Sequence, residues 1–197
     1  MSAGRRIGVL GGTFDPPHIG HLVTAVNVRY ELNLDVVLMV VANEPWQKVG
    51  SRDVSPAIDR YAMVRAAVDG VDGVESSDIE LRRGGPSYSI DTLEELRAAE
   101  PTAELFLILG DDAAAGLGSW ERTEDLVDMC RIVVVDRPGS VRAVPDRFEV
   151  ERVEVPHLEV SSTDLRARVV EGRPTDYLLP QEVSCLIRDR GLYCDRR

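Results

Sequence analysis

The chain has 197 residues, enough for one domain with its own hydrophobic core and no need of a metal or a disulfide to hold it. It carries 34 acidic and 23 basic residues, a formal net charge of −11, and its lack of a basic run excludes an extended nucleic-acid-binding surface. No apolar stretch approaches the roughly 18 residues needed to cross a bilayer, and no signal peptide is recognisable, so we expect a cytoplasmic protein without a membrane partner. The odd number and wide spacing of the three cysteines, Cys130, Cys185 and Cys194, fit a protein of a reducing compartment. We interpret these cysteines as structural residues.

Six apolar, strand-like runs recur along the chain, and helical patterns separate most of them. The runs lie at about residues 6–10, 36–42, 76–81, 104–109, 131–136 and 151–155. The second and fourth are continuously apolar, as expected for parallel strands covered on both faces. This order predicts an α/β fold, a Rossmann-like doubly wound parallel sheet in three α/β/α layers, with ligands in the crevice outside the carboxyl ends of the strands. We expect one domain over residues 1–197, with a helical C-terminal part at about 162–197.

Apolar spacing and capping signals predict the helices. The first starts at Ile19, and the residues expected on its apolar side are Ile19, Leu22, Val23, Val26 and Tyr30. The second starts at Ser55-Pro56, and the residues expected on one face of it are Ile58, Tyr61, Ala62 and Arg65. A third is marked by Ile90, Leu93 and Leu96 and stops before Pro101. Near the C-terminus, Gly172 closes one helix, and another runs from Pro180 to about Gly191.

The segment Gly11-Gly12-Thr13-Phe14-Asp15-Pro16-Pro17-His18-Ile19-Gly20-His21 lies at the first strand-to-helix junction. Glycines bend the chain there, and free N–H groups at the positive end of the helix dipole favour a bound anion. Gly20 lets a phosphate approach the backbone closely. His18 and His21 share a helix face and can donate to the same oxygens. The alternatives are a purely structural turn and a histidine metal pair, although no nearby cysteine or third histidine completes a zinc shell.

A second anion-binding pattern is Ser161-Ser162-Thr163-Asp164-Leu165-Arg166, which follows a strand and opens a helix. One hydroxyl can cap the helix while free N–H groups and the other hydroxyls bind phosphate oxygens. Arg166, one turn later, presents a planar fork to the same oxygens. An ordinary Ser/Thr-capped helix is the alternative. Together with the first segment, this one is expected to form the opposite side of a phosphate site.

These segments resemble known motifs. The first is similar to the Gly-x-Phe-Asp-x-x-His-x-Gly-His signature of the nucleotidyltransferases related to class I aminoacyl-tRNA synthetases, and the second to the Ser-Ser-Thr-x-Ile/Leu-Arg motif of the nicotinate-nucleotide adenylyltransferases. Three further stretches resemble the same narrower family, and they are Pro45-Trp46-Gln47-Lys48, Pro86-Ser87-Tyr88-Ser89-Ile90-Asp91-Thr92, and Gly110-Asp111-Asp112 with Trp120 downstream. Trp46 and Gln47 depart from the Pro-His often found there, and Ala42 stands where many relatives have asparagine.

The resemblance implies transfer of the adenylyl group of ATP to nicotinate mononucleotide, giving deamido-NAD and pyrophosphate in NAD biosynthesis. The implied catalytic residues are His18, His21, Lys48 and Arg166. The implied ATP-binding residues are Gly11, Gly12, Thr13, Phe14, His18, Gly20, His21, Lys48, Gly110, Asp112, Ser161, Ser162, Thr163 and Arg166. Those implied for the mononucleotide are Asp15, Tyr88, Ser89, Thr92 and Trp120. Mg²⁺ would accompany ATP, held mainly by phosphates and waters rather than by a protein metal site.

Some assignments have alternatives. Trp120 can stack on the pyridine ring or belong to the core, and Asp111-Asp112 can be a solvated turn. Arg60 matches an arginine of the family, and a salt bridge on a helix surface is the other interpretation. The alternative enzyme is a pantetheine-phosphate adenylyltransferase or another adenylyltransferase of the superfamily, and the alternative of a different class is a non-catalytic nucleotide sensor. The oligomeric state is left open, a homo-oligomer included.

Overall fold

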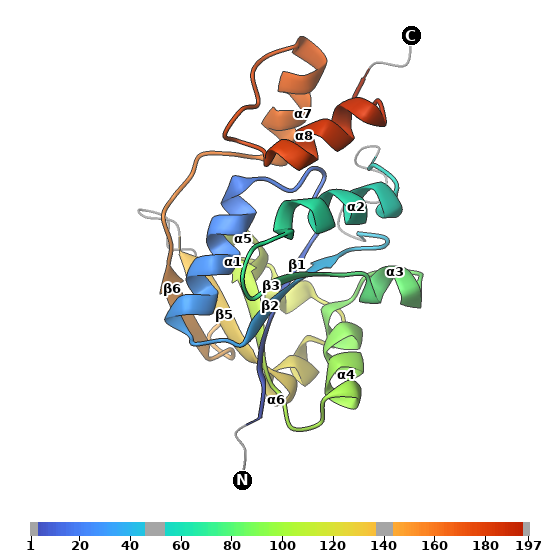
Figure 1. The fold of residues 1–197 in the computed structure, drawn as a ribbon. Coiled ribbons are helices and arrows are strands. Elements are labelled where there is room, and N and C mark those ends of the chain that lie inside the picture. The colour runs from blue at the N-terminus through green and yellow to red at the C-terminus, as the bar shows by residue number, and fades with distance from the viewer. Residues whose placement is uncertain (1–3, 46–53, 137–143, 195–197) are drawn as a thin grey trace.

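The computed structural model describes residues 4–45, 54–136 and 144–194. Six parallel strands form one sheet in the order β3-β2-β1-β4-β5-β6 (Figure 1). The strands are β1 (Arg6–Gly12), β2 (Val36–Val41), β3 (Val74–Ser77), β4 (Glu104–Gly110), β5 (Arg131–Asp136) and β6 (Val150–Glu154). The chain therefore builds outward from β1 to β3 and then returns to the other side of β1 as β4. This order confirms the predicted doubly wound α/β fold, and it places the switch point between β1 and β4.

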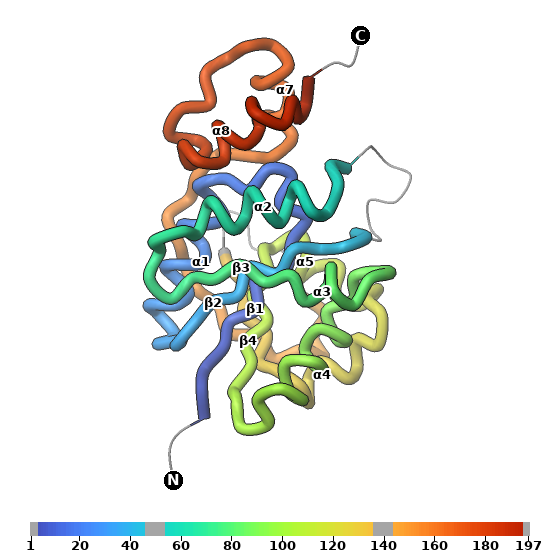
Figure 2. The backbone as a smooth tube through the Cα atoms, turned by 45° about the vertical axis from the view of Figure 1, so that its right-hand side comes forward, coloured from blue at the N-terminus to red at the C-terminus, as the bar shows by residue number. Residues whose placement is uncertain are grey.

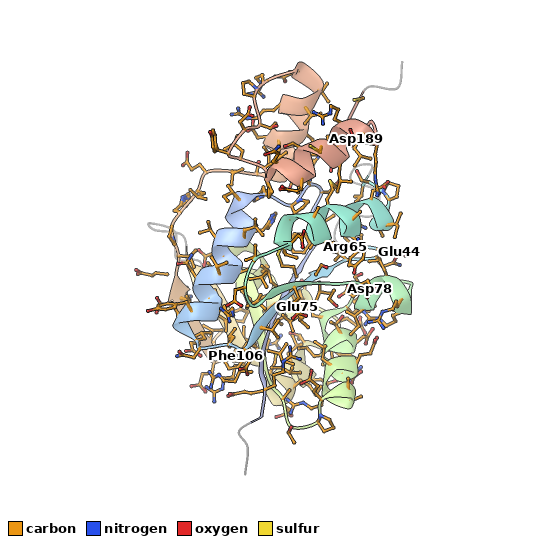
Figure 3. The ribbon with its side chains drawn as sticks, viewed as in Figure 1. Glu44, Arg65, Glu75, Asp78, Phe106 and Asp189 are labelled. Atoms are coloured by element: carbon orange, nitrogen blue, oxygen red, sulfur yellow. The ribbon has the colours of Figure 1, made fainter. Side chains whose placement is uncertain are left out.

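Helices cover both faces of this sheet. They are α1 (Ile19–Glu31), α2 (Ala57–Val68), α3 (Ile79–Arg83), α4 (Ser89–Ala99), α5 (Asp111–Ala115), α6 (Leu126–Met129), α7 (Ser162–Glu171) and α8 (Gln181–Asp189), with short 3₁₀ turns η2 (Leu117–Ser119) and η3 (Thr123–Asp125). Alternate residues of β4 enter different cores: Leu107 packs with α4 and α5, whereas Phe106, fully buried (Figure 3), packs with α1 and α2. No helix of the described residues is long and apolar enough to cross a membrane.

A third, smaller core joins the C-terminal helices to the rest of the molecule. Helix α2 turns Val64 and Val68 toward the sheet, while Met63 and Ala67 pack against α7 and α8. The members of this third core are Met63, Ala67, Leu165, Leu179, Val183 and Ile187. Figures 1 and 2 show α7 and α8 beside α2, at the end of the sheet where α1 begins. The C-terminal part of the chain is thereby brought next to the first strand-to-helix junction.

One predicted strand is partly wrong. The run at 76–81 was expected to be a strand, but β3 ends at Ser77 and residues 79–83 form helix α3. Strand β3 lies at the edge of the sheet and pairs only with β2. Ile79 leaves the strand direction to enter the core with Leu93 of α4, so its apolar character reflects helix packing and not strand alternation.

The predicted buried faces of two helices also need correction. In α1 the fully buried residues are Ala25 and Val28, while Val26 and Tyr30 are exposed, Tyr30 by 79%. Ala25 and Val28 pack in the core that α1 shares with the sheet. In α2, which is packed on two sides, Ile58 is exposed and the buried residues are Arg60, Met63, Val64, Ala67 and Val68. The predicted proline start is confirmed with a shift of one position, since Pro56 is the N-cap of α2 rather than its first residue.

Candidate active site

The turn between β1 and α1 (Thr13–His18), hereafter the β1–α1 turn, is buried throughout. Phe14 has a φ of 50°, a left-handed conformation that bends the chain sharply after β1. The His18 and His21 rings stack with centroids 3.7 Å apart. The main-chain N–H of His18 donates to Nδ1 of the His21 ring at 3.1 Å. Because Nδ1 accepts this bond, the neutral His21 ring carries its proton on Nε2, and that atom is the donor it can offer to a ligand.

Gly20, in the first turn of α1, leaves room for this histidine pair. A Cβ at this position would lie 3.1 Å from Nδ1 of His18 and equally close to Cγ1 of Val160. The packing of His18 and of the segment before α7 therefore requires a small residue here, in addition to any approach of a phosphate. A Cβ on Gly11 or Gly110 would instead meet no atom within 4 Å, so these two glycines border open space.

The second motif lies directly against the β1–α1 turn. Ser161 caps α7, its Oγ accepting from the N–H of Asp164 at 3.2 Å. Ser162 Oγ donates to the carbonyl of Pro16 at 2.8 Å, and Arg166 Nη1 donates to the carbonyl of Asp15 at 2.7 Å. The segment is thus both a serine-capped helix and the partner of the first motif. The structure brings the two predicted anion-binding segments together across more than 140 positions of sequence.

Arg60 of α2 is enclosed beneath the same turn. Its side chain is 1% exposed, and its guanidinium donates to four main-chain carbonyls, those of Thr13 (2.9 Å), Ala42 (2.6 Å), Asn43 (3.0 Å) and Ser55 (2.8 Å). The interpretation of Arg60 as a surface salt bridge was wrong. It holds the segments that follow β1 and β2 in one arrangement. A signal for this was present in the sequence, because Arg60 shares its helical spacing with the buried Met63, Val64 and Ala67.

A cavity of about 260 Å³ opens beside the β1–α1 turn, at the carboxyl ends of β1 and β4. The predicted site residues that line it are Gly11, Gly12, Thr13, Tyr88, Ser89, Gly110 and Trp120. Glu80 and Ser87 line it as well, and neither was predicted. We use the name cavity wall for Glu80, Ser87, Tyr88, Ser89 and Trp120. Trp120 serves both interpretations, since it packs against the core under α4 and also faces the cavity.

Glu80 is the buried acid of the cavity wall. Thr92 Oγ1 donates to its Oε1 at 2.8 Å, and Arg83 Nη2 lies 4.0 Å from the same oxygen. Burial raises the pKa of Glu80 above its ordinary value, against the opposing effects of its hydrogen bonds and of Arg83. Nε1 of Trp120 is one of the buried polar atoms that have no hydrogen-bond partner among the described residues. Thr92, 1% exposed, supports the wall from behind and does not line the cavity.

The remaining predicted residues take separate places. Asp15 is 1% exposed, and its carboxylate accepts from the Tyr193 hydroxyl and the Ser55 N–H instead of lining the cavity. Asp112 is exposed on the first turn of α5, and Lys48, like Trp46 and Gln47, lies outside the described residues. Asp111, 4% exposed, is buried 3.8 Å from Arg152 and is no solvated turn. Within the described ranges, no group of three or more His, Cys, Asp or Glu side chains is arranged to hold a metal ion.

The sequence comparisons agree over nearly the whole chain. The cytidylyltransferase-like family model matches residues 9–168. A protein of Saccharopolyspora erythraea described as a probable nicotinate-nucleotide adenylyltransferase is 43% identical over 196 residues, covering 98% of this chain and 92% of the relative. A protein of Streptomyces coelicolor with the same description is 45% identical over 186 residues, with 93% and 98% covered.

Solved structures show the same fold at lower identity. A Plasmodium falciparum nicotinic acid mononucleotide adenylyltransferase complexed with NaAD has a TM-score of 0.78 and 16% identity, covering 96% of this chain and 97% of that one. A putative nicotinate-nucleotide adenylyltransferase from Vibrio parahaemolyticus has a TM-score of 0.70 and 21% identity, with 97% and 96% covered. With the sequence relatives above 40% identity and the motifs assembled at one crevice, the chain belongs to the cytidylyltransferase-like family and, within it, to the nicotinate-nucleotide adenylyltransferases.

Proposed function

We propose that the crevice at the ends of β1 and β4 is where the adenylyl group of ATP passes to nicotinate mononucleotide, releasing deamido-NAD and pyrophosphate. One observation carries the proposal. Two predicted anion-binding segments far apart in sequence, the β1–α1 turn and Ser161–Arg166, meet at the switch point of the sheet beside a cavity large enough for a pyridine ring. The expected phosphate site lies next to a cavity lined by both apolar and polar side chains. This combination suits a nucleotide with an aromatic base.

The phosphates of ATP would lie against the histidine pair and the start of α7. His18, His21 and Arg166 are assigned to the charge on the α-phosphoryl group and the departing pyrophosphate, with Lys48 as a further cation. The glycines and hydroxyls expected around them keep the ATP-binding roles given above. A donor held at Nε2 of His21 by the bond to its Nδ1 is oriented before the substrate arrives, which is the arrangement that stabilises developing charge most effectively.

The transfer itself needs little acid–base chemistry. The 5′-phosphate of the mononucleotide is ionised at neutral pH, and it would attack the α-phosphorus of ATP in line as the bond to pyrophosphate breaks. No covalent enzyme intermediate forms and no general base is required. Catalysis then rests on holding the two substrates in register and on neutralising negative charge.

The cavity wall would receive the pyridine ring. Trp120 offers a ring face to the cationic pyridine, and the first N–H groups of α4, at Tyr88 and Ser89, lie at the positive end of that helix. A carboxylate on the ring is favoured there over an amide, whose NH₂ would face other donors. Thr92 would act through the wall, since its hydroxyl is bonded to Glu80.

Mg²⁺ fits this site as an ion that arrives with ATP. The described residues contain no cluster of protein ligands, and Mg²⁺ is commonly held by phosphate oxygens and water with one or two carboxylates. Asp112, exposed on the first turn of α5, is the carboxylate we assign to a water of that ion or to a ribose hydroxyl. When bound, the ion would neutralise charge on the leaving pyrophosphate.

A pyrophosphate-release assay tests the proposal. The purified chain is incubated with ATP and Mg²⁺ and, separately, with nicotinate mononucleotide, nicotinamide mononucleotide or phosphopantetheine. We expect release with nicotinate mononucleotide and little with phosphopantetheine. Faster release with phosphopantetheine would favour the alternative adenylyltransferase. Binding of ATP with no release for any acceptor would favour the nucleotide sensor.

A further inference from the structure

Tyr193 connects the last described turn of the chain to the β1–α1 turn. It follows α8 and lies half-buried, and its hydroxyl donates to Oδ1 of Asp15 at 2.7 Å. The other carboxylate oxygen of Asp15 accepts from the N–H of Ser55 at 3.3 Å. Asp15 is 1% exposed, so replacement of the tyrosine donor by bulk water would require the turn to open. The two residues are 178 positions apart.

The same short turn is bonded from α7 as well. Arg166 donates to the carbonyl of Asp15, and Ser162 donates to the carbonyl of Pro16. Directly after the turn, the N–H of Ile19 in α1 donates at 3.0 Å to the carbonyl of Leu178, which lies between α7 and α8. Tyr193 differs from these contacts because it meets a charged side chain. Burial and the neighbouring Asp15 charge raise the pKa of Tyr193, so its hydroxyl keeps its proton and remains a donor over the working pH range.

We propose that Tyr193 is a positioning residue for adenylyl transfer: it fixes Asp15, and through Asp15 it fixes the turn that presents His18 and His21 to the phosphates. The inference rests on the proposed placement of ATP against those histidines. Tyr193 does not line the cavity. Its effect should therefore appear in the handling of ATP and not in the affinity for the mononucleotide.

The first test is Tyr193→Phe, which removes one oxygen and keeps the ring that packs against the third core. Because a displacement of about 1 Å at a reacting group can cost on the order of 10²-fold in rate, we expect kcat/KM for ATP to fall by about 10- to 100-fold, mostly in kcat. The dissociation constant of nicotinate mononucleotide should stay within about twofold. Tyr177→Phe is the matched control, since Tyr177 is 96% exposed.

A double-mutant cycle with Asp15→Asn separates positioning from a general loss of stability. If Tyr193 acts through Asp15, the combined variant should be little slower than the slower single variant. Rate losses that multiply would overturn the inference, as would a Tyr193→Phe enzyme with normal kcat, or one whose rate recovers fully at a temperature where it is folded. Failure of the proposed function is distinguishable, because it shows in the wild-type chain as no release with nicotinate mononucleotide.

Discussion

The β1–α1 turn and the cavity wall lie on either side of the same crevice, yet the chain holds them differently. The turn receives donors from three distant elements: Arg60 of α2, Arg166 of α7 and Tyr193 after α8. The wall is joined to the segment after β2, where the Asn43 N–H donates to Ser87 Oγ at 2.8 Å, and its buried acid Glu80 accepts from Thr92, twelve positions away. Within the described residues, the wall also has a buried donor without a hydrogen-bond partner, Nε1 of Trp120.

This contrast matches the two tasks of such an enzyme. Charge stabilisation at the phosphorus depends on donors that are already in place, and long-range bonds restrict the turn to one geometry. Recognition of a ring can tolerate adjustment, and polar groups that lack partners in the protein gain them when a ligand binds. On the proposed function, the crevice combines a fixed reacting end, the β1–α1 turn, with a recognising end, the cavity wall, that the ligand completes.

Loss of a donor at the fixed end should have the largest effect. We expect His21→Ala to lower kcat by about 10²–10³-fold, because its imidazole interacts most with charge that grows during transfer. The affinity for nicotinate mononucleotide should change little, as measured by calorimetry beside steady-state kinetics. His157→Ala is the control, since His157 is exposed and belongs to no motif. Near-normal turnover of His21→Ala would remove His21 from the mechanism.

Arg60 tests whether the fixed end depends on its buried cation for stability. Arg60→Met leaves four carbonyls without this donor, and an unsatisfied buried group costs roughly 1–3 kcal/mol, so we expect the free energy of unfolding to fall by about 3 kcal/mol. Arg65→Met, on the exposed side of the same helix (Figure 3), should change it by no more than about 0.5 kcal/mol. Equal losses in urea unfolding for the two variants would contradict the role given to Arg60.

The recognising end can be examined through substrate preference. Trp120→Ala should lower kcat/KM for the nicotinate and nicotinamide mononucleotides by a similar factor, because stacking does not distinguish the two rings. Ser89→Ala should erode the preference for the acid by about tenfold, since a missing hydrogen bond to a charged group costs roughly 1.5 kcal/mol or more. If Trp120→Ala alone abolishes the discrimination, the assignment of these two residues is wrong.

The smallest expected effect concerns pH and Glu80. Because burial raises the pKa of Glu80 above 4.5, the folded state binds this proton more tightly than the unfolded state. The stability gained from this proton is complete below about pH 4.5 and is lost as pH rises through the pKa of Glu80 in the folded state. It amounts to about 1.4 kcal/mol for each pH unit by which the folded and unfolded pKa values differ. We therefore expect the stability of Glu80→Gln, measured relative to wild type, to be greater at neutral pH than at pH 4.

Glu94 supplies a control of opposite sign. The hydrogen bond from Arg122 lowers the pKa of Glu94, so its contribution is present above the usual glutamate pKa and is lost as pH falls through the lowered value. In thermal unfolding from pH 3 to pH 8, Glu94→Gln should therefore be less stable than wild type at neutral pH but not in acid. The same pH trend in both variants would show that the burial of Glu80 has no such effect.

The parts of the site that the sequence predicted correctly are those whose geometry is local. His18 and His21 stack because they are three residues apart at a helix start, and Ser161 caps α7 because it directly precedes it. The doubly wound sheet was equally predictable, since continuous apolar runs alternate with helical patterns. Such features depend on spacing within one element.

Other features depend on contacts that no short segment encodes. Tyr193 meets Asp15 only because α8 packs on α2, and Glu80 reaches the cavity only because β3 stops at Ser77 and a helix follows. The faces of α1 and α2 were mistaken for a related reason. A helix packed on two sides, such as α2, buries a charged residue like Arg60 when main-chain carbonyls converge on it. The spacing of Arg60 matches that of the buried residues, but no short segment encodes the carbonyls that receive it.

The bonds that close the β1–α1 turn can form only when the C-terminal helices are present. A ribosome releases residues 13–18 early, but the donors from Ser162, Arg166 and Tyr193 are among the last to emerge. The nascent chain can pair β1, β2 and β3 by neighbouring contacts long before that. On the roles proposed for His18 and His21, adenylyl transfer awaits the C-terminal helices, because a translation product without them holds the histidines without the contacts that set their turn.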